Sequence, residues 1–242
     1  MYSFQDTLGP VAVAFTDRRD GVSAAPFDSL NLALTGNDDP AAVAENWRRV
    51  LDDFAPGAEL ADLSQVHGCD VVRAEGPHEG GRPEADGITT TRPGLVLAVR
   101  AADCVPVLLA DPSAGVVGAV HCGRPGLAAG VVPRAVEALR EQGAADLRAW
   151  VGPHVCGGCY EVPAAMADEV AAVVPEARAT TTWGTPSLDL GAGVWAQLAA
   201  AGVTVTDASR CTRESDDLYS YRRDGDRSGR HAGLVVLRGG AR

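Results

Sequence analysis

Two histidines and one cysteine near the ends of short apolar runs carry the side chains best suited to metal chemistry. His67 lies in the string Gln-Val-His-Gly, Cys104 follows an apolar run, and His121 closes the run Val-Gly-Ala-Val. Two imidazoles and one thiolate are ligand types that hold Zn²⁺, and three protein ligands leave one coordination position open for water or substrate. These residue types therefore predict an open, catalytic metal site at His67, Cys104 and His121.

Each of these residues also has an alternative interpretation. A cysteine after an apolar run is often a small buried hydrophobe, and a lone loop histidine can simply be hydrogen-bonded there. Cys104 could instead be a nucleophile with His121 or His67 as its base, as in Cys–His hydrolases. Gly123 and Gly126 follow His121, and such strand ends and loops are where rigid scaffolds carry catalytic residues. The position of these candidate residues together at predicted strand ends and loops favours a functional site.

Arginines gather at two places where an anion could bind. Arg222 and Arg223 lie in the C-terminal string Ser-Tyr-Arg-Arg-Asp-Gly, and Arg18 and Arg19 lie near the N-terminus. Guanidinium groups bind phosphate or carboxylate oxygens, and glycine loops let backbone N–H groups approach an anion. A solvated charged turn is the alternative at both places.

Cys156 and Cys159 form a C-x-x-C pair, which in some proteins is a redox dithiol. The pair follows Gly152-Pro153 and leads toward Pro163, so we expect a loop rather than the helix start of a thioredoxin-type motif. The sequence has no second C-x-x-C that would complete a Cys₄ zinc site. A zinc deaminase of the H-x-E type is also excluded, because no H-x-E string occurs.

The composition describes an acidic chain with enough apolar residues for a sizeable core. It has 242 residues, of which 46% are hydrophobic, and a formal net charge of −11. This charge disfavours nucleic acid and anionic membranes as partners, because both bind basic faces. No signal pattern opens the chain and no apolar run is long enough to span a membrane, so we expect a cytoplasmic protein with reduced thiols.

Hydrophobic periodicity places the candidate residues on alternating strands and helices. Strands are predicted over residues 10–16, 71–74, 95–99, 105–110, 116–121, 147–151, 203–205 and 234–237. Helices are predicted after the N-cap Asp39, over 127–142 with Pro133 as a kink or the true start, over 163–174, and around 190–198. Residues 76–87 are expected to form a surface loop. The alternation predicts an α/β (α+β) layered fold of mixed sheets flanked by helices, as one compact domain over residues 1–242.

Several strings of the sequence together resemble the laccase-domain family, once labelled multicopper polyphenol oxidases. They include FTDRRDGVSAAPFDSLNL, SQVHGCDVV, EADGITTTRPGLVLAVRAADCVPVLLAD, VGAVHCGRPGL, VGPHVCGGCYEV and CTRESDDLYSYRRDGDRSGRHAGLVVL, in the family's order over nearly the whole chain. Bacterial members are described as zinc-containing purine nucleoside phosphorylases. The resemblance implies one zinc per chain on His67, Cys104 and His121, and two mixed sheets sandwiched between helices.

The resemblance also implies an activity and its partners. It implies phosphorolysis of adenosine, inosine, guanosine and methylthioadenosine, together with adenosine deamination, so purine nucleosides and inorganic phosphate are the expected partners. Asn31, Arg18 or Arg19, and Arg222 or Arg223 match family positions near the site. Copper is not expected, because three ligands cannot supply several copper centres. A peptidoglycan-editing role described in the family keeps a Cys–His hydrolase acting on a cell-wall precursor as the alternative.

The stretch after His121 departs from the family pattern. The commoner string is H-A-G-W-R-G, whereas here Arg124 stands in place of the tryptophan and Pro125 in place of the arginine. An arginine displaced by one position could preserve an anion contact, but the preferred nucleoside and the oligomeric state do not follow from the sequence. A third alternative is a non-enzymatic scaffold stabilised by zinc, which would need a fourth ligand such as Cys122 to close the site. Adjacent residues on a strand point to opposite faces, so Cys122 should point away from His121.

Overall fold

Long apolar strands build two stacked sheets in the computed structural model, which describes residues 1–78 and 80–239. The strands of the first sheet are, in spatial order, β1 (Tyr2–Leu8), β2 (Val11–Thr16), β13 (His231–Leu237), β6 (Leu95–Ala101) and β3 (Glu59–Ala61). Neighbouring strands are antiparallel except for β3, which runs parallel to β6. The sheet is therefore mixed, as the sequence predicts.

The second sheet holds the strands that carry the candidate site. In spatial order it contains β12 (Thr204–Asp207), β9 (Arg148–Val151), β7 (Val105–Asp111), β8 (Val116–Cys122), β5 (Gly87–Thr90) and β4 (Val71–Arg73). Its outermost pairs are parallel and its inner pairs antiparallel. Two further short strands, β10 (Arg178–Thr180) and β11 (Pro186–Leu188), pair with each other.

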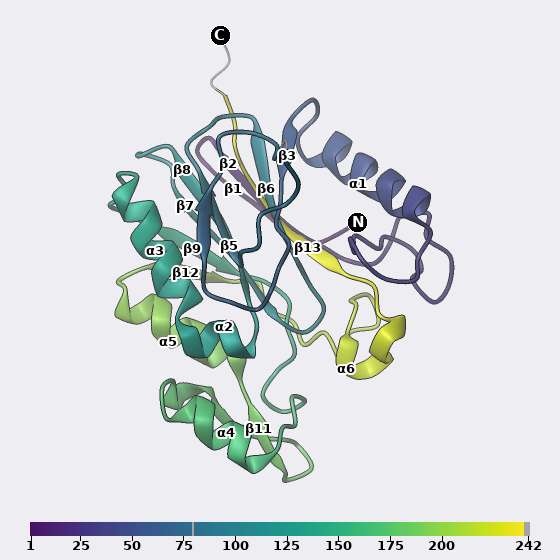
Figure 1. Cartoon of the computed structure of the whole chain (residues 1–242), viewed down its shortest axis with the longest axis vertical. Helices are drawn as coiled ribbons and strands as arrows, with labels where there is room; N and C mark the ends of the chain where they lie inside the picture. Colours follow the sequence, from purple (N-terminus) through teal and green to yellow (C-terminus); the bar gives the residue numbers. More distant parts are fainter. Residues whose placement is uncertain (79, 240–242) are drawn as a thin grey trace.

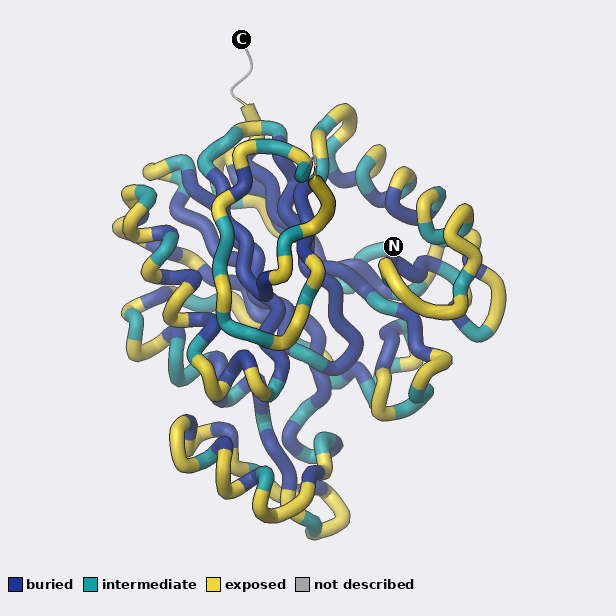
Figure 2. The backbone as a smooth tube through the Cα atoms, in the orientation of Figure 1, coloured by how far each residue is buried: buried dark blue, intermediate teal, exposed yellow. Residues whose placement is uncertain are grey.

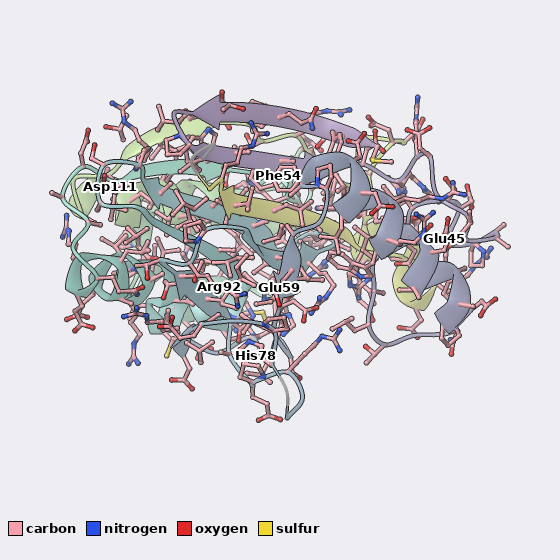
Figure 3. The ribbon with its side chains drawn as sticks, turned by 90° about the horizontal axis from the view of Figure 1, so that it is seen from above. Glu45, Phe54, Glu59, His78, Arg92 and Asp111 are labelled. Atoms are coloured by element: carbon pink, nitrogen blue, oxygen red, sulfur yellow. The ribbon has the colours of Figure 1, made fainter. Side chains whose placement is uncertain are left out.

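Helices cover the outer faces of both sheets (Figure 1). The helices are α1 (Pro40–Phe54), α2 (Arg124–Ala129), α3 (Val131–Glu141), α4 (Ala164–Ala171), α5 (Leu190–Ala200) and the single turn α6 (Tyr221–Asp224), with 3₁₀ turns at Pro175–Ala177 and Gly225–Arg227. Helix α1 packs on the first sheet, and α2, α3 and α5 pack on the second. Seen from above in Figure 3, α1 lies along the first sheet, with Phe54 at its C-terminal end beside the strands.

Alternation along single strands divides the core into three apolar layers. In β7, Val107 and Leu109 face the helices of the second sheet, whereas Leu108 and Ala110 face the first sheet. In β6, Val96 packs toward α1. Figure 2 shows the strands of both sheets buried and the outer turns of the helices exposed. The order helix, sheet, sheet, helix confirms the predicted layered fold as a single compact domain.

Most predicted elements are present, and one predicted helix is interrupted. The stretch 127–142 contains two helices, because Gly130 adopts a left-handed backbone conformation (φ 78°) that ends α2 and precedes α3. Pro133 is the third residue of α3, where its missing N–H needs no partner inside the helix. The N-cap prediction is confirmed, because the Asp39 side chain accepts a hydrogen bond from the backbone N–H of Ala41.

Several elements were not predicted from the sequence. Strand β1 carries polar residues on its exposed face, and β3, β10 and β11 have three residues each, too few for a period to emerge. The predicted loop over 76–87 ends directly in β5, and the helix predicted over 163–174 ends at Ala171. Within the described part of the chain, no helix is long and apolar enough to cross a lipid bilayer.

Candidate active site

The fold brings His67, Cys104 and His121 together at the ends of the two central strands of the second sheet, β7 and β8. One donor atom from each residue lies within 4.8 Å of the other two, and Cys104 Sγ is 3.8 Å from His67 Nε2. Cys104 directly precedes β7 and His121 nearly ends β8. These strands are antiparallel neighbours, so the start of one lies beside the end of the other. The pairing of β7 with β8 therefore brings Cys104 and His121 together although they are distant in the sequence.

A buried carboxylate, Asp86, orients both histidines. Its Oδ1 lies 2.7 Å from His121 Nδ1, which therefore donates a hydrogen bond and leaves Nε2 free for a ligand. The same carboxylate accepts backbone N–H groups from Val66, His67 and Gly68 at 3.2, 3.1 and 2.6 Å. Asp86 is fully buried. The sequence places Asp86 in the predicted surface loop and does not identify it as a site residue. Its position directly before strand β5 is the one local signal that could have done so.

Two glycines leave room for the His67 loop, which explains their position after His121. A Cβ at Gly123 would lie 2.6 Å from the His67 ring, and a Cβ at Gly126 would lie 2.8 Å from the Gly68 carbonyl oxygen. Such contacts are too short for real side chains. His67 itself has a positive φ of 59°, an unfavourable backbone conformation held by the three N–H bonds to Asp86.

The electrostatics of the cluster favour a thiolate. Burial alone would raise the pKa of Cys104, but the adjacent His121 and His67 imidazoles lower it to about 6. Burial would lower the pKa of His121, but Cys104 and Asp86 raise it to about 9. A thiolate is the form of cysteine that binds metals or attacks as a nucleophile. The pair therefore suits either chemistry.

The donor set fits a metal ion with one open position. Two imidazoles and a thiolate converge, and a carboxylate stands behind one imidazole as is usual for metal-binding histidines. Cys122 is buried in the core on the helix side of the sheet, so it cannot close the site as a fourth ligand. The free side of the cluster instead faces a cavity.

The cavity beside the cluster has a volume of about 790 Å³. His67, Cys104 and His121 all line it, and Tyr160 and Arg222 line it from other segments. A volume of this size accommodates a molecule as large as a nucleoside with a small anion. Access to a cavity is what distinguishes a reactive metal centre from a structural one.

Arg222 and Arg223 are neighbours in the chain, but they lie in different surroundings. The Arg222 guanidinium lines the cavity, 4.5 Å from the centre of the Tyr160 ring, and its backbone N–H donates to Asp103 at 2.6 Å. The Arg223 guanidinium instead donates to backbone carbonyls and to Asp224, which hold it away from the cavity. Of the two predicted residues, the structure brings only Arg222 to the site.

The N-terminal candidates lie outside the large cavity. Arg18 donates to the Asp28 carbonyl and stacks on a tyrosine ring, and Arg19 is exposed. Neither is among the described residues that line this cavity. Asn31 is buried, donates to Asp38, and lines a smaller adjoining cavity of about 240 Å³.

Besides Arg222, three arginines line the large cavity: Arg124, Arg230 and Arg100, the last of which is ion-paired with Asp62. Arg124 is the residue that departs from the family pattern, and its place at the first turn of α2 brings it beside His121. Arg230 lies farther along the C-terminal run of arginines and glycines that was predicted to bind an anion. It lines both the large and the small cavity and donates to the Ser228 and Gly229 carbonyls. With Arg222 they give an acidic protein a locally cationic pocket.

The site thus combines a three-donor cluster with a cationic pocket in a double-sheet sandwich flanked by helices. Residues 12–238 match the family model described as multi-copper polyphenol oxidoreductase laccase, and the chain belongs to this family. This confirms the resemblance seen in the sequence.

Curated relatives and solved structures cover almost the whole chain. A purine nucleoside phosphorylase of Streptomyces griseus is 53% identical over 95% of both chains, and one of Streptomyces coelicolor is 51% identical over 98% of this chain and 100% of its own. The crystal structure of a Neisseria meningitidis protein has a TM-score of 0.87 and 33% identity, covering 98% of this chain and 99% of its own. YlmD from Geobacillus stearothermophilus has a TM-score of 0.86 and 29% identity, covering 99% and 100%.

Proposed function

We propose that this chain is a zinc-dependent purine nucleoside phosphorylase that acts on adenosine, inosine, guanosine and methylthioadenosine and also deaminates adenosine. The observation that carries the proposal is the three-donor cluster of His67, Cys104 and His121, open on its free side to a cavity lined by arginines. The names of the relatives that cover the chain support the same activity.

The pocket offers separate surfaces for the two substrates. Arg222, Arg124 and Arg230 supply positive charge for phosphate, which the net charge of −11 would otherwise repel. Leu34 and Tyr221, both partly exposed, line the same cavity and offer an apolar face for a purine ring. In phosphorolysis the C1′–O bond to phosphate forms as the C1′–N9 bond breaks, and the purine leaves with the proton that hydrogen phosphate gives up.

His67, Cys104 and His121 would hold the zinc, with Asp86 fixing the imidazole of His121. When bound, zinc would supply Lewis-acid polarisation of an oxygen at its open position. Arg222 is held over Tyr160 and anchored through its backbone to Asp103, so its guanidinium is oriented before phosphate arrives. In deamination, a water oxygen bonds to C6 of the adenine base and ammonia leaves from the same carbon.

A metal analysis combined with a product assay tests the proposal. Protein prepared without chelator should contain zinc rather than copper, and it should convert inosine and phosphate to hypoxanthine and ribose 1-phosphate. Without phosphate, adenosine should still yield inosine. Zinc-loaded protein that phosphorolyses none of the four nucleosides would show that the proposal is wrong.

The lowered pKa of Cys104 and its contact with His67 also suit a second candidate function, a Cys–His hydrolase acting on a peptidoglycan precursor. A zinc-bound Cys104 should resist alkylation until a chelator is added, whereas a free nucleophile should be alkylated in metal-replete protein with loss of activity. Activity that survives complete zinc removal would decide for the hydrolase.

A further inference from the structure

A second group of metal-type side chains lies outside the large cavity. Donor atoms of Cys156, Cys159, Cys211 and Glu214 all lie within 4.8 Å of one another. None of the four is among the described residues that line the cavity. In the sequence they form two pairs of the same spacing, Cys-x-x-Cys and Cys-x-x-Glu, separated by about a fifth of the chain.

The parallel strands β9 and β12 bring the two pairs together. Beyond their ends the segments stay side by side, because His154 forms a β-bridge with Cys211. The chain turns sharply at Cys156, whose carbonyl accepts the backbone N–H groups of Cys159 and Tyr160 at 2.9 and 3.1 Å. This turn points both sulfurs of the first pair toward the second pair.

The sulfur–oxygen separation in this group matches an edge of a tetrahedral zinc site. Zinc–sulfur bonds of about 2.3 Å and zinc–oxygen bonds of about 2.0 Å place tetrahedral sulfur–oxygen neighbours about 3.5 Å apart. Cys159 Sγ lies 3.4 Å from Glu214 Oε1. Cys211 Sγ accepts the backbone N–H of Cys156 at 3.5 Å, a bond that supports a thiolate ligand. Within the described residues, Glu214 forms no ion pair with an arginine.

We propose that Cys156, Cys159, Cys211 and Glu214 form a second, closed zinc site with a structural role. Four protein donors complete a tetrahedral shell and leave no position for substrate. The ion joins the segment after β9 to the segment after β12, and each thiol that binds releases its proton. The proposal does not depend on the function proposed above.

The closed site fastens two segments that shape the large cavity. Tyr160 directly follows Cys159 and lines the cavity, and Thr212 directly follows Cys211 and donates to Asp103 at 2.6 Å. Asp103 in turn precedes Cys104 and accepts the backbone N–H of Arg222. The second zinc therefore stabilises the wall against which Arg222 lies.

Zinc counting in paired variants tests the proposal. Protein purified without chelator should contain about two zinc ions, one per complete donor set. Cys104→Ser should keep only the second ion, Cys159→Ser only the first, and the double variant neither. Cys69, a free cysteine outside both groups, provides the control, and Cys69→Ser should keep both ions.

The two proposals fail in different ways. One zinc in the wild type and none in Cys104→Ser would overturn the second site and leave the first. One zinc in the wild type and one in Cys104→Ser would overturn the first and leave the second. A disulfide between any two of the three cysteines in freshly purified protein, found by mass spectrometry together with absence of the second zinc, also overturns the closed site.

Cobalt substitution keeps the test decisive if Cys159→Ser does not fold. Co²⁺ added to zinc-free Cys104→Ser protein should give the visible absorption of a tetrahedral ion and the ultraviolet charge-transfer bands of several thiolates. Equivalent addition of Zn²⁺ should abolish both. A spectrum without thiolate bands would show that these cysteines do not bind metal.

Discussion

The two cysteine-containing clusters use similar side chains but differ in the number of donors and in access. His67, Cys104 and His121 provide three donors and line a cavity of about 790 Å³. The group of Cys156, Cys159, Cys211 and Glu214 provides four donors and lies outside that cavity. A metal ion is reactive when a coordination position stays open and structural when the protein fills all four. One chain thus carries both arrangements.

The carboxylates of the two clusters, Asp86 and Glu214, also differ in role. Asp86 is fully buried and binds His121 Nδ1 and three backbone N–H groups, so it orients the proposed ligands and is not itself one of them. Glu214 is exposed and lies 3.4 Å from a sulfur, so it is placed to act as a ligand itself.

Cys104→Ser should abolish zinc binding at the open cluster and reduce phosphorolysis by at least about 100-fold, because even changes behind the ligands cost about 10- to 100-fold. Zinc analysis and the rate of hypoxanthine release measure both effects. Cys69→Ser serves as the matched control and should behave as the wild type. Full zinc retention in the Cys104 variant would remove this residue from the site.

Asp86→Asn should weaken zinc binding at the open cluster by about 10- to 100-fold, since the amide cannot hold the His121 imidazole as the carboxylate does. Competition with a chromophoric chelator measures the affinity of each ion. The ion at the closed site should be unaffected. An equal loss at both sites would mean that the variant disturbs the whole fold.

Arg222→Ala should raise the KM for phosphate by about 10- to 100-fold, because a charge-assisted contact contributes about 1.5–3 kcal/mol. Adenosine deamination, which uses water, should change less, and zinc content should be unchanged. Initial rates over a series of phosphate concentrations provide the measurement. An unchanged KM would assign Arg222 to packing against Tyr160 alone.

Arg223→Ala should have the smallest effect on phosphate use and act on stability instead. Its guanidinium donates to the carbonyls of Thr212, Ser215 and Leu218, so its loss should lower the free energy of unfolding by about 1–3 kcal/mol. Urea denaturation followed by fluorescence measures the change. A raised KM for phosphate at unchanged stability would reverse the roles of the two arginines.

The sequence alone determined the elements whose signals are local. Alternating apolar residues predicted strands β2, β6, β7 and β8, and the cap at Asp39 predicted the start of α1. The prediction that His67, Cys104 and His121 act as metal ligands likewise rests on residue types at strand ends and on the family strings. Apolar patterns, helix caps and short motifs each involve only a few neighbouring residues, so they can be recognised without knowledge of the fold.

Only the tertiary structure decided which distant residues meet. Asp86 reaches His121 through the β5–β8 pairing, and Cys159 reaches Glu214 through the pairing of β9 with β12, across 35 and 55 residues. In the sequence the C-x-x-C pair lacks a matching second pair. Its neighbours in space, Cys211 and Glu214, form a Cys-x-x-Glu pair on a distant segment. Arg222 and Arg223 have nearly the same local sequence, yet one lines the cavity and the other binds carbonyls. Strand order and sheet stacking set these contacts, and neither leaves a periodic signal in the residues they bring together.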